Sequence, residues 1–283
     1  MSQYGEIFRL LREGKKLSLK EVAGSEISTA QLSRFETGKS QLTLEVFFTC
    51  LQRMSISYEE FSLYLQQEPE SNLSQELMEA YYNGDLKRIQ EIEIDWSAKC
   101  EKNPDITKYR LDLIMIQIAK YYCNTDDVVS EENIRYLMDY LFKIEEWGEY
   151  ERWLFSNAYA VFPSSSLELL AQELLSKNQK YFKNTGYRQE VAVILLHLVS
   201  AFLERKEFEK VTLFLNTLHD FPFLEEDAHI RLGFRFYRAY FAYLTGYHNA
   251  KIEMEKCIEV AQFLSCDKIS QTLQEIFKDV TDM

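Results

Sequence analysis

The sequence predicts an all-α protein made of two parts. Its 283 residues include only four Pro and nine Gly, so few positions interrupt a helix. Apolar residues recur at spacings of three and four through most of the chain, which is the period of an amphipathic helix. A hydrophobic fraction of 46% is ample for two buried cores. We therefore expect a small N-terminal helical domain followed by a larger helical body.

Five short helices are predicted in the N-terminal domain, residues 1–66. The first has Ile7, Leu10 and Leu11 on one face. Each later helix begins at a Ser or Thr whose hydroxyl can cap it, namely Ser18, Ser28, Thr43 and Ser57. The third helix closes at a glycine, which is typical of a helix C-terminus. The five predicted segments are residues 3–13, 18–23, 28–38, 43–54 and 57–65.

The third predicted helix has an apolar face and a small, polar or cationic face. Leu32 and Phe35 share the apolar face at a spacing of three. The other face suits the major groove of DNA, because Gln can bond adenine twice and Arg can fork onto guanine. A surface helix that merely meets water is the alternative. The residues expected to read bases are Thr29, Ala30, Gln31, Ser33 and Arg34.

A wider residue pattern surrounds this helix. It comprises Gly5, Leu10, Arg12, 17–18, 22–23, 27–28, 32–36, Gly38 and Leu44. In these positions the segment resembles the lambda-repressor-like, or xenobiotic-response-element, DNA-binding domain, a helix-turn-helix fold. The resemblance implies that Arg12 and Glu36 form a structural ion pair across the domain. It also implies contacts to the DNA backbone from Lys15, Lys16, Ser18 and Lys39.

The net charge of −13 is unevenly distributed. Residues 1–57 contain eight Lys and Arg against six Glu, which gives +2 and leaves −15 on the rest. Because negative charge repels phosphate, a nearly neutral N-terminal domain joined to an acidic body should bind DNA weakly as a monomer. We expect dimerisation to supply the missing affinity.

Polar residues and the helix-stopping Pro69 interrupt the apolar pattern at residues 66–72 and predict a linker or hinge, residues 67–73, before the body, residues 74–283. In the body, a small or polar turn repeatedly precedes an aromatic or large apolar residue that opens the next helix. Such turns are typical of the interior of a tetratricopeptide repeat, whose helix pairs stack into a solenoid with a concave face. A non-repetitive helical bundle is the alternative. The turns lie at 83–86, 147–150, 206–208 and 245–247.

Together with residues 140–151 and 154–158 in mid-chain, the two parts resemble the Rgg (also Rgg/GadR/MutR) transcriptional regulators of streptococci and their relatives. The resemblance spans essentially the full length. It implies a cytoplasmic homodimer that binds double-stranded promoter DNA at a palindrome. It further implies control by a short hydrophobic signalling peptide, secreted and re-imported, and a connection with RNA polymerase.

Two sets of residues are candidates for peptide binding. In the first, three arginines lie along one helix stripe between residues 227 and 244, and either a neighbouring acidic residue or a ligand carboxylate should face them. The second is Arg152 with Asn157, since an Asn amide in a solenoid groove can bond a peptide backbone. The first set comprises Arg231, Phe234, Arg235, Tyr237 and Arg238, with Phe241 beside them.

Signatures of other protein classes are missing from the sequence. No GxGxxG, GxxxxGK[ST] or HExxH motif occurs, and the four His are scattered, so we expect no enzyme activity, no cofactor and no metal site. No apolar run approaches the ~20 residues that cross a bilayer, and we expect a cytoplasmic protein. Five cysteines without a CxxC pair indicate free thiols.

Three alternatives to a peptide-controlled regulator remain open. The solenoid can serve only as a dimerisation scaffold for a ligand-independent repressor or activator. The helix-turn-helix can dock a protein instead of DNA, as in an adaptor. The solenoid can also recognise a small intracellular molecule, which an enclosed apolar groove would favour.

Overall fold

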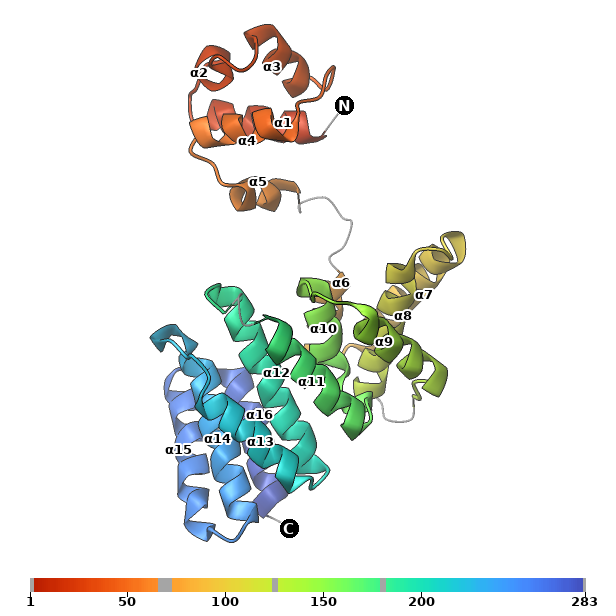
Figure 1. Cartoon of the computed structure of the whole chain (residues 1–283), viewed down its shortest axis with the longest axis vertical. Helices are drawn as coiled ribbons and strands as arrows, with labels where there is room; N and C mark the ends of the chain where they lie inside the picture. Colours follow the sequence, from red (N-terminus) through yellow and green to blue (C-terminus); the bar gives the residue numbers. More distant parts are fainter. Residues whose placement is uncertain (1–2, 66–72, 124–126, 179–181, 282–283) are drawn as a thin grey trace. The chain divides into compact units, whose positions relative to one another are not determined.

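The computed structural model describes residues 3–65, 73–123, 127–178 and 182–281, and these residues form helices joined by turns, without a strand (Figure 1). This confirms the all-α prediction. The chain divides into two compact units, Met1–Glu76 and Leu77–Met283. The predicted linker lies outside the described residues, except for Leu73, which begins α6.

All five helices predicted in the N-terminal unit are present. The predicted N-caps accept hydrogen bonds from backbone N–H groups three residues ahead, as Ser28 Oγ does from Gln31 at 3.1 Å. Gly38 has a φ of +70° and follows α3, and Lys39 N–H donates to Arg34 O at 2.7 Å, which closes the helix in a Schellman turn. The helices are α1 (Gln3–Gly14), α2 (Leu19–Ala23), α3 (Thr29–Glu36), α4 (Leu44–Arg53) and α5 (Tyr58–Leu65).

The core of this unit differs from the prediction on α1. Leu11 is buried as expected, but Leu10 is 59% exposed and Phe8 takes the central position instead. Phe8, Leu11 and Arg12 lie at i, i+3 and i+4, so they share one face, whereas Leu10 points about 200° away from Phe8. Apolar residues on both sides of α1 made its buried face ambiguous from sequence.

Gly5 on α1 lies against the backbone of α3. A Cβ at Gly5 would lie 2.1 Å from the carbonyl oxygen of Phe35, which cannot swing aside as a side-chain tip can. We expect Gly5→Ala to destabilise the N-terminal unit by about 1–3 kcal/mol, measured by hydrogen exchange of the α1 amides. Gly14→Ala is the control, since nothing lies within 4 Å of its Cβ position. Wild-type exchange in Gly5→Ala would contradict this close approach.

The C-terminal unit is a two-layer helical solenoid (Figure 1). Even-numbered helices contact one another in series, α8 with α10, α10 with α12, α12 with α14 and α14 with α16, and they form one layer. Odd-numbered helices lie outside it, where α9 contacts α11. This confirms the tetratricopeptide-like prediction. The helices are α6 (Leu73–Tyr82), α7 (Leu86–Lys102), α8 (Thr107–Cys123), α9 (Glu131–Lys143), α10 (Glu149–Ala158), α11 (Ser164–Asn178), α12 (Thr185–Glu204), α13 (Phe208–His219), α14 (Ala228–Leu244), α15 (Lys251–Phe263) and α16 (Asp267–Thr281).

Within the described ranges, short 3₁₀ helices connect some of these elements, namely η1 (Tyr159–Val161), η3 (Glu225–Asp227) and η4 (His248–Ala250). Each turn predicted from the sequence separates two helices. The turns before α7, α13 and α15 lead from an inner helix to an outer one, as expected inside a repeat. The turn at Trp147 and Gly148 instead joins outer α9 to inner α10, so it lies between repeats. No described helix is both long and apolar enough to span a bilayer.

Candidate functional site

The outer face of α3 presents the residues expected to read DNA bases. Thr29, Ala30, Gln31 and Arg34 are exposed and Ser33 is half-buried. Leu32 and Phe35, on the opposite face, are 0% and 6% exposed. The helix is therefore anchored by its apolar side and leaves its polar side available.

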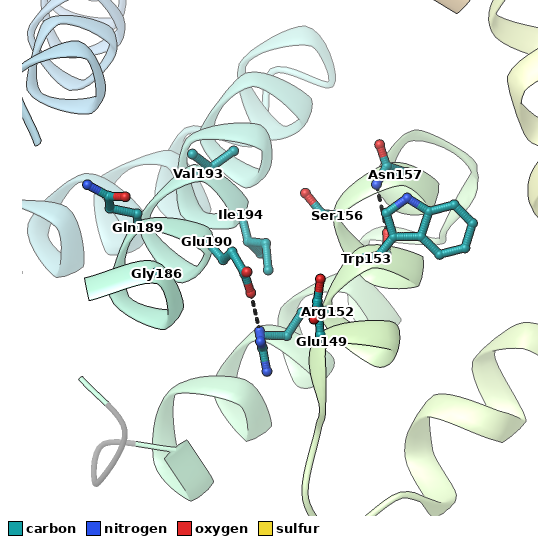
Figure 2. Close-up of a pocket in the computed structure, with 10 residues that line it drawn as sticks. All are labelled: Glu149, Arg152, Trp153, Ser156, Asn157, Gly186, Gln189, Glu190, Val193 and Ile194. Atoms are coloured by element: carbon teal, nitrogen blue, oxygen red, sulfur yellow. Dashed lines mark hydrogen bonds and ion pairs between the residues drawn. The ribbon is translucent and has the colours of Figure 1, made fainter. Parts of the chain in front are cut away.

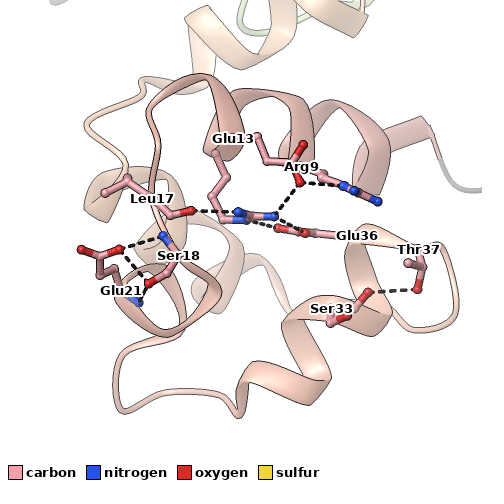
Figure 3. Close-up of polar contacts among 9 residues, drawn as sticks. Arg9, Glu13, Leu17, Ser18, Glu21, Ser33, Glu36 and Thr37 are labelled. Atoms are coloured by element: carbon pink, nitrogen blue, oxygen red, sulfur yellow. Dashed lines mark hydrogen bonds and ion pairs between the residues drawn. The ribbon is translucent and has the colours of Figure 1, made fainter.

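A buried ion pair fixes α3 against α1. Arg12 Nε donates to Glu36 Oε1 at 2.6 Å and a terminal nitrogen of Arg12 donates to Glu36 Oε2 at 2.8 Å, with both side chains less than a tenth exposed. A further Arg12 nitrogen donates to Leu17 O at 2.8 Å, and Figure 3 shows Leu17, Glu13 and Glu36 around this point. The bond to Glu36 raises the pKa of Arg12. The ion pair implied by the family resemblance is confirmed.

The predicted backbone-contact residues differ in their surroundings. Lys16 and Lys39 are exposed, while Lys15 Nζ donates to Ser55 O at 3.2 Å. Ser18 donates through both its N–H and its hydroxyl to the carboxylate of Glu21, at 2.7 Å each (Figure 3). A phosphate at Ser18 would therefore have to displace Glu21. The contact of Ser18 with DNA stays a prediction.

Arg53, a structural residue that sequence reasoning missed, holds the turn between α2 and α3. One guanidinium nitrogen donates to Ala23 O at 2.8 Å and to Val22 O at 3.2 Å, which satisfies carbonyls at the end of α2. The other terminal nitrogen pairs with Glu26. Because Arg53 is 30 residues away from Ala23 in sequence, no local pattern pointed to this cap.

Two adjoining cavities lie on the inner layer of the C-terminal unit. The first, of about 430 Å³, lies between α10 and α12, and Figure 2 shows Trp153, Ser156 and Asn157 of α10 across from α12. The second, of about 390 Å³, is lined only by α6, α8, α10, α12, α14, α16 and Tyr159 of η1. Trp153, Ser156 and Asn157 line both cavities, so together they form one groove, here called the concave groove.

One stripe of α12 runs along the whole concave groove. Its members recur at spacings of three and four, so they share a single helix face. Most other residues of α12 are buried and apolar, which hid this stripe from a periodicity analysis. The groove residues of the stripe are Gly186, Gln189, Glu190, Val193, His197, Ser200 and Glu204.

Arg152 and Asn157, the second predicted peptide-binding set, both line the concave groove (Figure 2). Arg152 is already bonded, since its Nε donates to Glu190 at 2.5 Å and another nitrogen donates to Trp147 O at 3.1 Å. The Asn157 amide donates to Trp153 O at 2.8 Å. Between them, the indole Nε1 of Trp153 is buried and has no hydrogen-bond acceptor among the described residues.

His197 contributes a neutral imidazole to the groove. Burial lowers its pKa to about 4, and its Nδ1 lies 3.1 Å from Ser156 O. The Ser156 hydroxyl lies 3.3 Å from the same nitrogen. In the tautomer that donates from Nδ1 to the carbonyl, Nε2 is an acceptor. The ring stacks on Tyr159, with 4.9 Å between the ring centroids.

The arginine stripe of α14 lies outside the concave groove. Arg235 and Arg238 face Glu253 of α15, at 3.4 and 3.2 Å, and Arg231 donates to Phe223 O at 3.1 Å. These contacts favour the structural alternative, in which a neighbouring acidic residue faces the cations. Phe234 is buried beside them, and of the five predicted residues on this helix only Tyr237 lines the concave groove.

The chain matches the model of a known protein family. The model of the C-terminal domain of the HTH-type transcriptional regulator Rgg matches residues 94–275, which is more than half of the protein. The chain belongs to the Rgg family of transcriptional regulators. Of the groove-lining helices, α8, α10, α12 and α14 lie entirely within the matched range, α16 lies partly within it and α6 lies outside it.

Solved structures with the same fold extend over both units. The SHP pheromone receptor Rgg2 of Streptococcus dysgalactiae has a TM-score of 0.79 at 20% identity, covering 98% of this chain and 99% of that one. A protein from Listeria monocytogenes EGD-e has a TM-score of 0.85 at 19% identity, with coverages of 99% and 97%. PrgX in its complex with cCF10 has a TM-score of 0.71 at 11% identity, with coverages of 100% and 93%.

Proposed function

We propose that this Rgg-family protein is a cytoplasmic homodimer that binds promoter DNA through α3 and is controlled by a short hydrophobic peptide in the concave groove. The observation that carries the proposal is the groove itself, an aromatic and apolar channel in which the buried Trp153 Nε1 has no acceptor among the residues that the structure describes. A buried donor without a partner is costly, and a peptide carbonyl would satisfy it. Two proteins of the same fold, the SHP pheromone receptor Rgg2 and PrgX in its complex with cCF10, support this ligand class.

The dimensions of the groove suit an extended peptide. Glu190 and Glu204 are fourteen residues apart on α12, which corresponds to about 21 Å along the helix. An extended chain covers that length with about six residues. Asn157, midway on the facing helix, is placed to bond the peptide backbone.

We infer dimerisation from the small positive charge of the DNA-binding unit. With a net charge of +2 over residues 1–57, one copy offers few phosphate contacts, and two copies on a palindrome double them. We propose that the peptide changes the placement of the two α3 helices relative to half-sites about 34 Å apart. The hinge in this mechanism is the segment around Pro69, outside the described residues.

Base reading by α3 is tested with Gln31→Ala and Arg34→Ala. We expect each to weaken binding to an operator selected from random duplex DNA by about 1–3 kcal/mol and to relax specificity at one base pair. Arg9→Ala, an exposed cation on α1, is the control for lost charge. Full operator binding by the double variant would instead support the protein-docking adaptor.

Control by peptide is tested by measuring operator affinity and thermal stability with and without synthetic hydrophobic heptapeptides. A peptide that raises stability and changes operator affinity supports the proposal. Raised stability with unchanged operator affinity would move the regulated step to recruitment of RNA polymerase. No effect of any peptide on either quantity would favour a solenoid that only dimerises.

A further inference from the structure

The end of the concave groove nearest the C-terminus of α12 has one formal charge, and it is negative. Of the described residues that line the second cavity, only Glu204 is an Asp, Glu, Lys or Arg. The others are apolar, aromatic or neutral polar, and they include Tyr81, Tyr82, Tyr122, Tyr159 and Tyr237. A charged ligand group at this end therefore meets an exposed carboxylate at the edge of a cavity lined with aromatic rings.

The Glu204 carboxylate has no cationic partner among the described residues. The carboxylate accepts a hydrogen bond from the hydroxyl of Ser200, at 3.4 Å. The neighbouring Arg205 is directed to other groups, since it donates to Ser164 Oγ at 2.9 Å and to Ala160 O at 3.0 Å. Lys268 lies over the ring of Tyr82, 4.8 Å from its centroid, but does not line the cavity.

Two further features favour a cation beside Glu204. Glu204 is the last residue of α12, where the helix dipole is negative. The tyrosine faces can stabilise a cation through their quadrupoles. Burial first, with the Glu204 charge adding to it, raises the pKa of Tyr237 and keeps the phenol neutral, so it does not itself become a second anion.

The opposite end of the groove combines a cation with its carboxylates. There Arg152 pairs with Glu190 at 2.5 Å, and Glu149, which also lines this end, lies three residues before Arg152 in the first turn of α10, where the helix dipole is positive (Figure 2 shows this end). The Glu204 end instead has a carboxylate at the negative end of a helix, with no Lys or Arg among the described lining residues. A peptide has one end that carries a positive charge, and this difference between the two ends of the groove distinguishes that end from the other.

We propose that Glu204 binds the free amino terminus of a peptide that runs along α12 from Glu204 toward Glu190. This assignment rests on the proposed peptide-binding function and adds the orientation of the ligand and the requirement for an unblocked amine. A charge-assisted hydrogen bond from the ammonium to the carboxylate would hold the peptide in this direction.

The test uses the full-length protein and two synthetic libraries of heptapeptides composed of Ala, Gly, Val, Leu, Ile and Phe. The libraries differ only at the amino end, which is free in one and acetylated in the other. Retained peptides are identified by mass spectrometry, and the dissociation constant of the most enriched one is measured in both forms. The variants are Glu204→Gln, Glu204→Asp, and the control Glu209→Gln, an exposed carboxylate on outer α13.

We expect acetylation to weaken binding to the wild type at least about tenfold, and Glu204→Gln to remove that preference. Glu204→Asp and Glu209→Gln should keep it, and unchanged thermal melting should show that all variants fold. Equal binding of free and acetylated peptides to the wild type, or an unchanged preference in Glu204→Gln, would overturn the assignment of Glu204 alone. Retention of neither library would overturn the peptide-binding function together with it.

A third library tests whether Glu204 binds the amino terminus of the peptide or a side-chain amine. It is acetylated at the amino end and carries one Lys at a randomised position. We expect it to be retained no better than the acetylated library without Lys. Retention that requires both the Lys and Glu204 would show that Glu204 selects a side-chain cation, and it would overturn the proposed peptide direction.

Discussion

Asp227→Ala should lower the free energy of unfolding of the C-terminal unit by about 3–5 kcal/mol, because it leaves the guanidinium of Arg188 buried without its main counter-charge. Arg188 and Asp227 are 4% and 1% exposed, and two Arg188 nitrogens lie 3.2–3.3 Å from the carboxylate. Gln189 and the backbone N–H of Leu224 donate to the same carboxylate, each at 2.8 Å. The pair ties η3 to α12.

The measurement is denaturant unfolding followed by tryptophan fluorescence, which reports on the C-terminal unit because all three Trp of the chain lie there. Glu225→Ala, an exposed carboxylate in the same 3₁₀ turn, is the control and should change stability by less than about 0.5 kcal/mol. If both variants unfold at the wild-type midpoint, the Arg188–Asp227 pair contributes nothing to stability.

The same pair predicts an acid-sensitive stability. Burial alone would raise the pKa of Asp227, but hydrogen bonds from Leu224, Arg188 and Gln189 outweigh it and lower the pKa to about 2, from an ordinary 3.8. Since the folded pKa is the lower one, the contribution is fully present above pH 3.8 and is lost as the pH falls toward 2. Asp227→Asn should therefore show a flatter decline of stability across this interval than the wild type.

The N-terminal unit was predictable from sequence because its signals are local. Ser18, Ser28 and Thr43 cap helices from positions adjacent to them, and Leu32 with Phe35 marks one buried face. The error at Leu10 arose where apolar residues occupy two sides of one helix. Caps and turns are encoded within a few residues, whereas a choice between two apolar faces depends on what packs against them.

The concave groove was much less predictable, since residues from distant parts of the chain form it. Leu77 on α6 and Ile276 on α16 line the same cavity, although 199 positions separate them. On α12, His197 and Glu204 interrupt a helix that is apolar on nearly every side, so periodicity gave no orientation. Arg152 and Asn157 were predicted from their residue types and Tyr237 from its place beside the arginine stripe. All three line the groove, and their contact with a peptide stays a prediction.

For the arginine stripe of α14, the helix face was predictable from sequence but the contact partner was not. The spacing of Arg231, Arg235 and Arg238 placed them on one side of a helix, as the structure has them. Their partner Glu253 belongs to α15, and which residue faces which depends on the register between two antiparallel helices. A single sequence contains the periodicity of each helix but not that register.

Glu36→Ala should destabilise the N-terminal unit by about 3–5 kcal/mol, because it leaves the buried Arg12 guanidinium with only the half-exposed carboxylate of Glu13, at 3.3 Å, as a counter-charge. Operator binding should fall as well, since Glu36 is the last residue of α3 and its bond to Arg12 holds that helix against α1. Hydrogen exchange of the α1 and α3 amides measures the first effect, and Trp fluorescence should stay unchanged because no Trp lies in this unit.

A double replacement separates the contribution of the ion pair from the cost of one unpaired charge. Arg12→Met with Glu36→Leu fills a similar volume with apolar groups, so it should recover most of the lost stability. Because neither residue is exposed, operator affinity should recover with it if the pair acts only by positioning α3. A stable double variant that still fails to bind the operator would show instead that Arg12 or Glu36 takes part in recognising DNA.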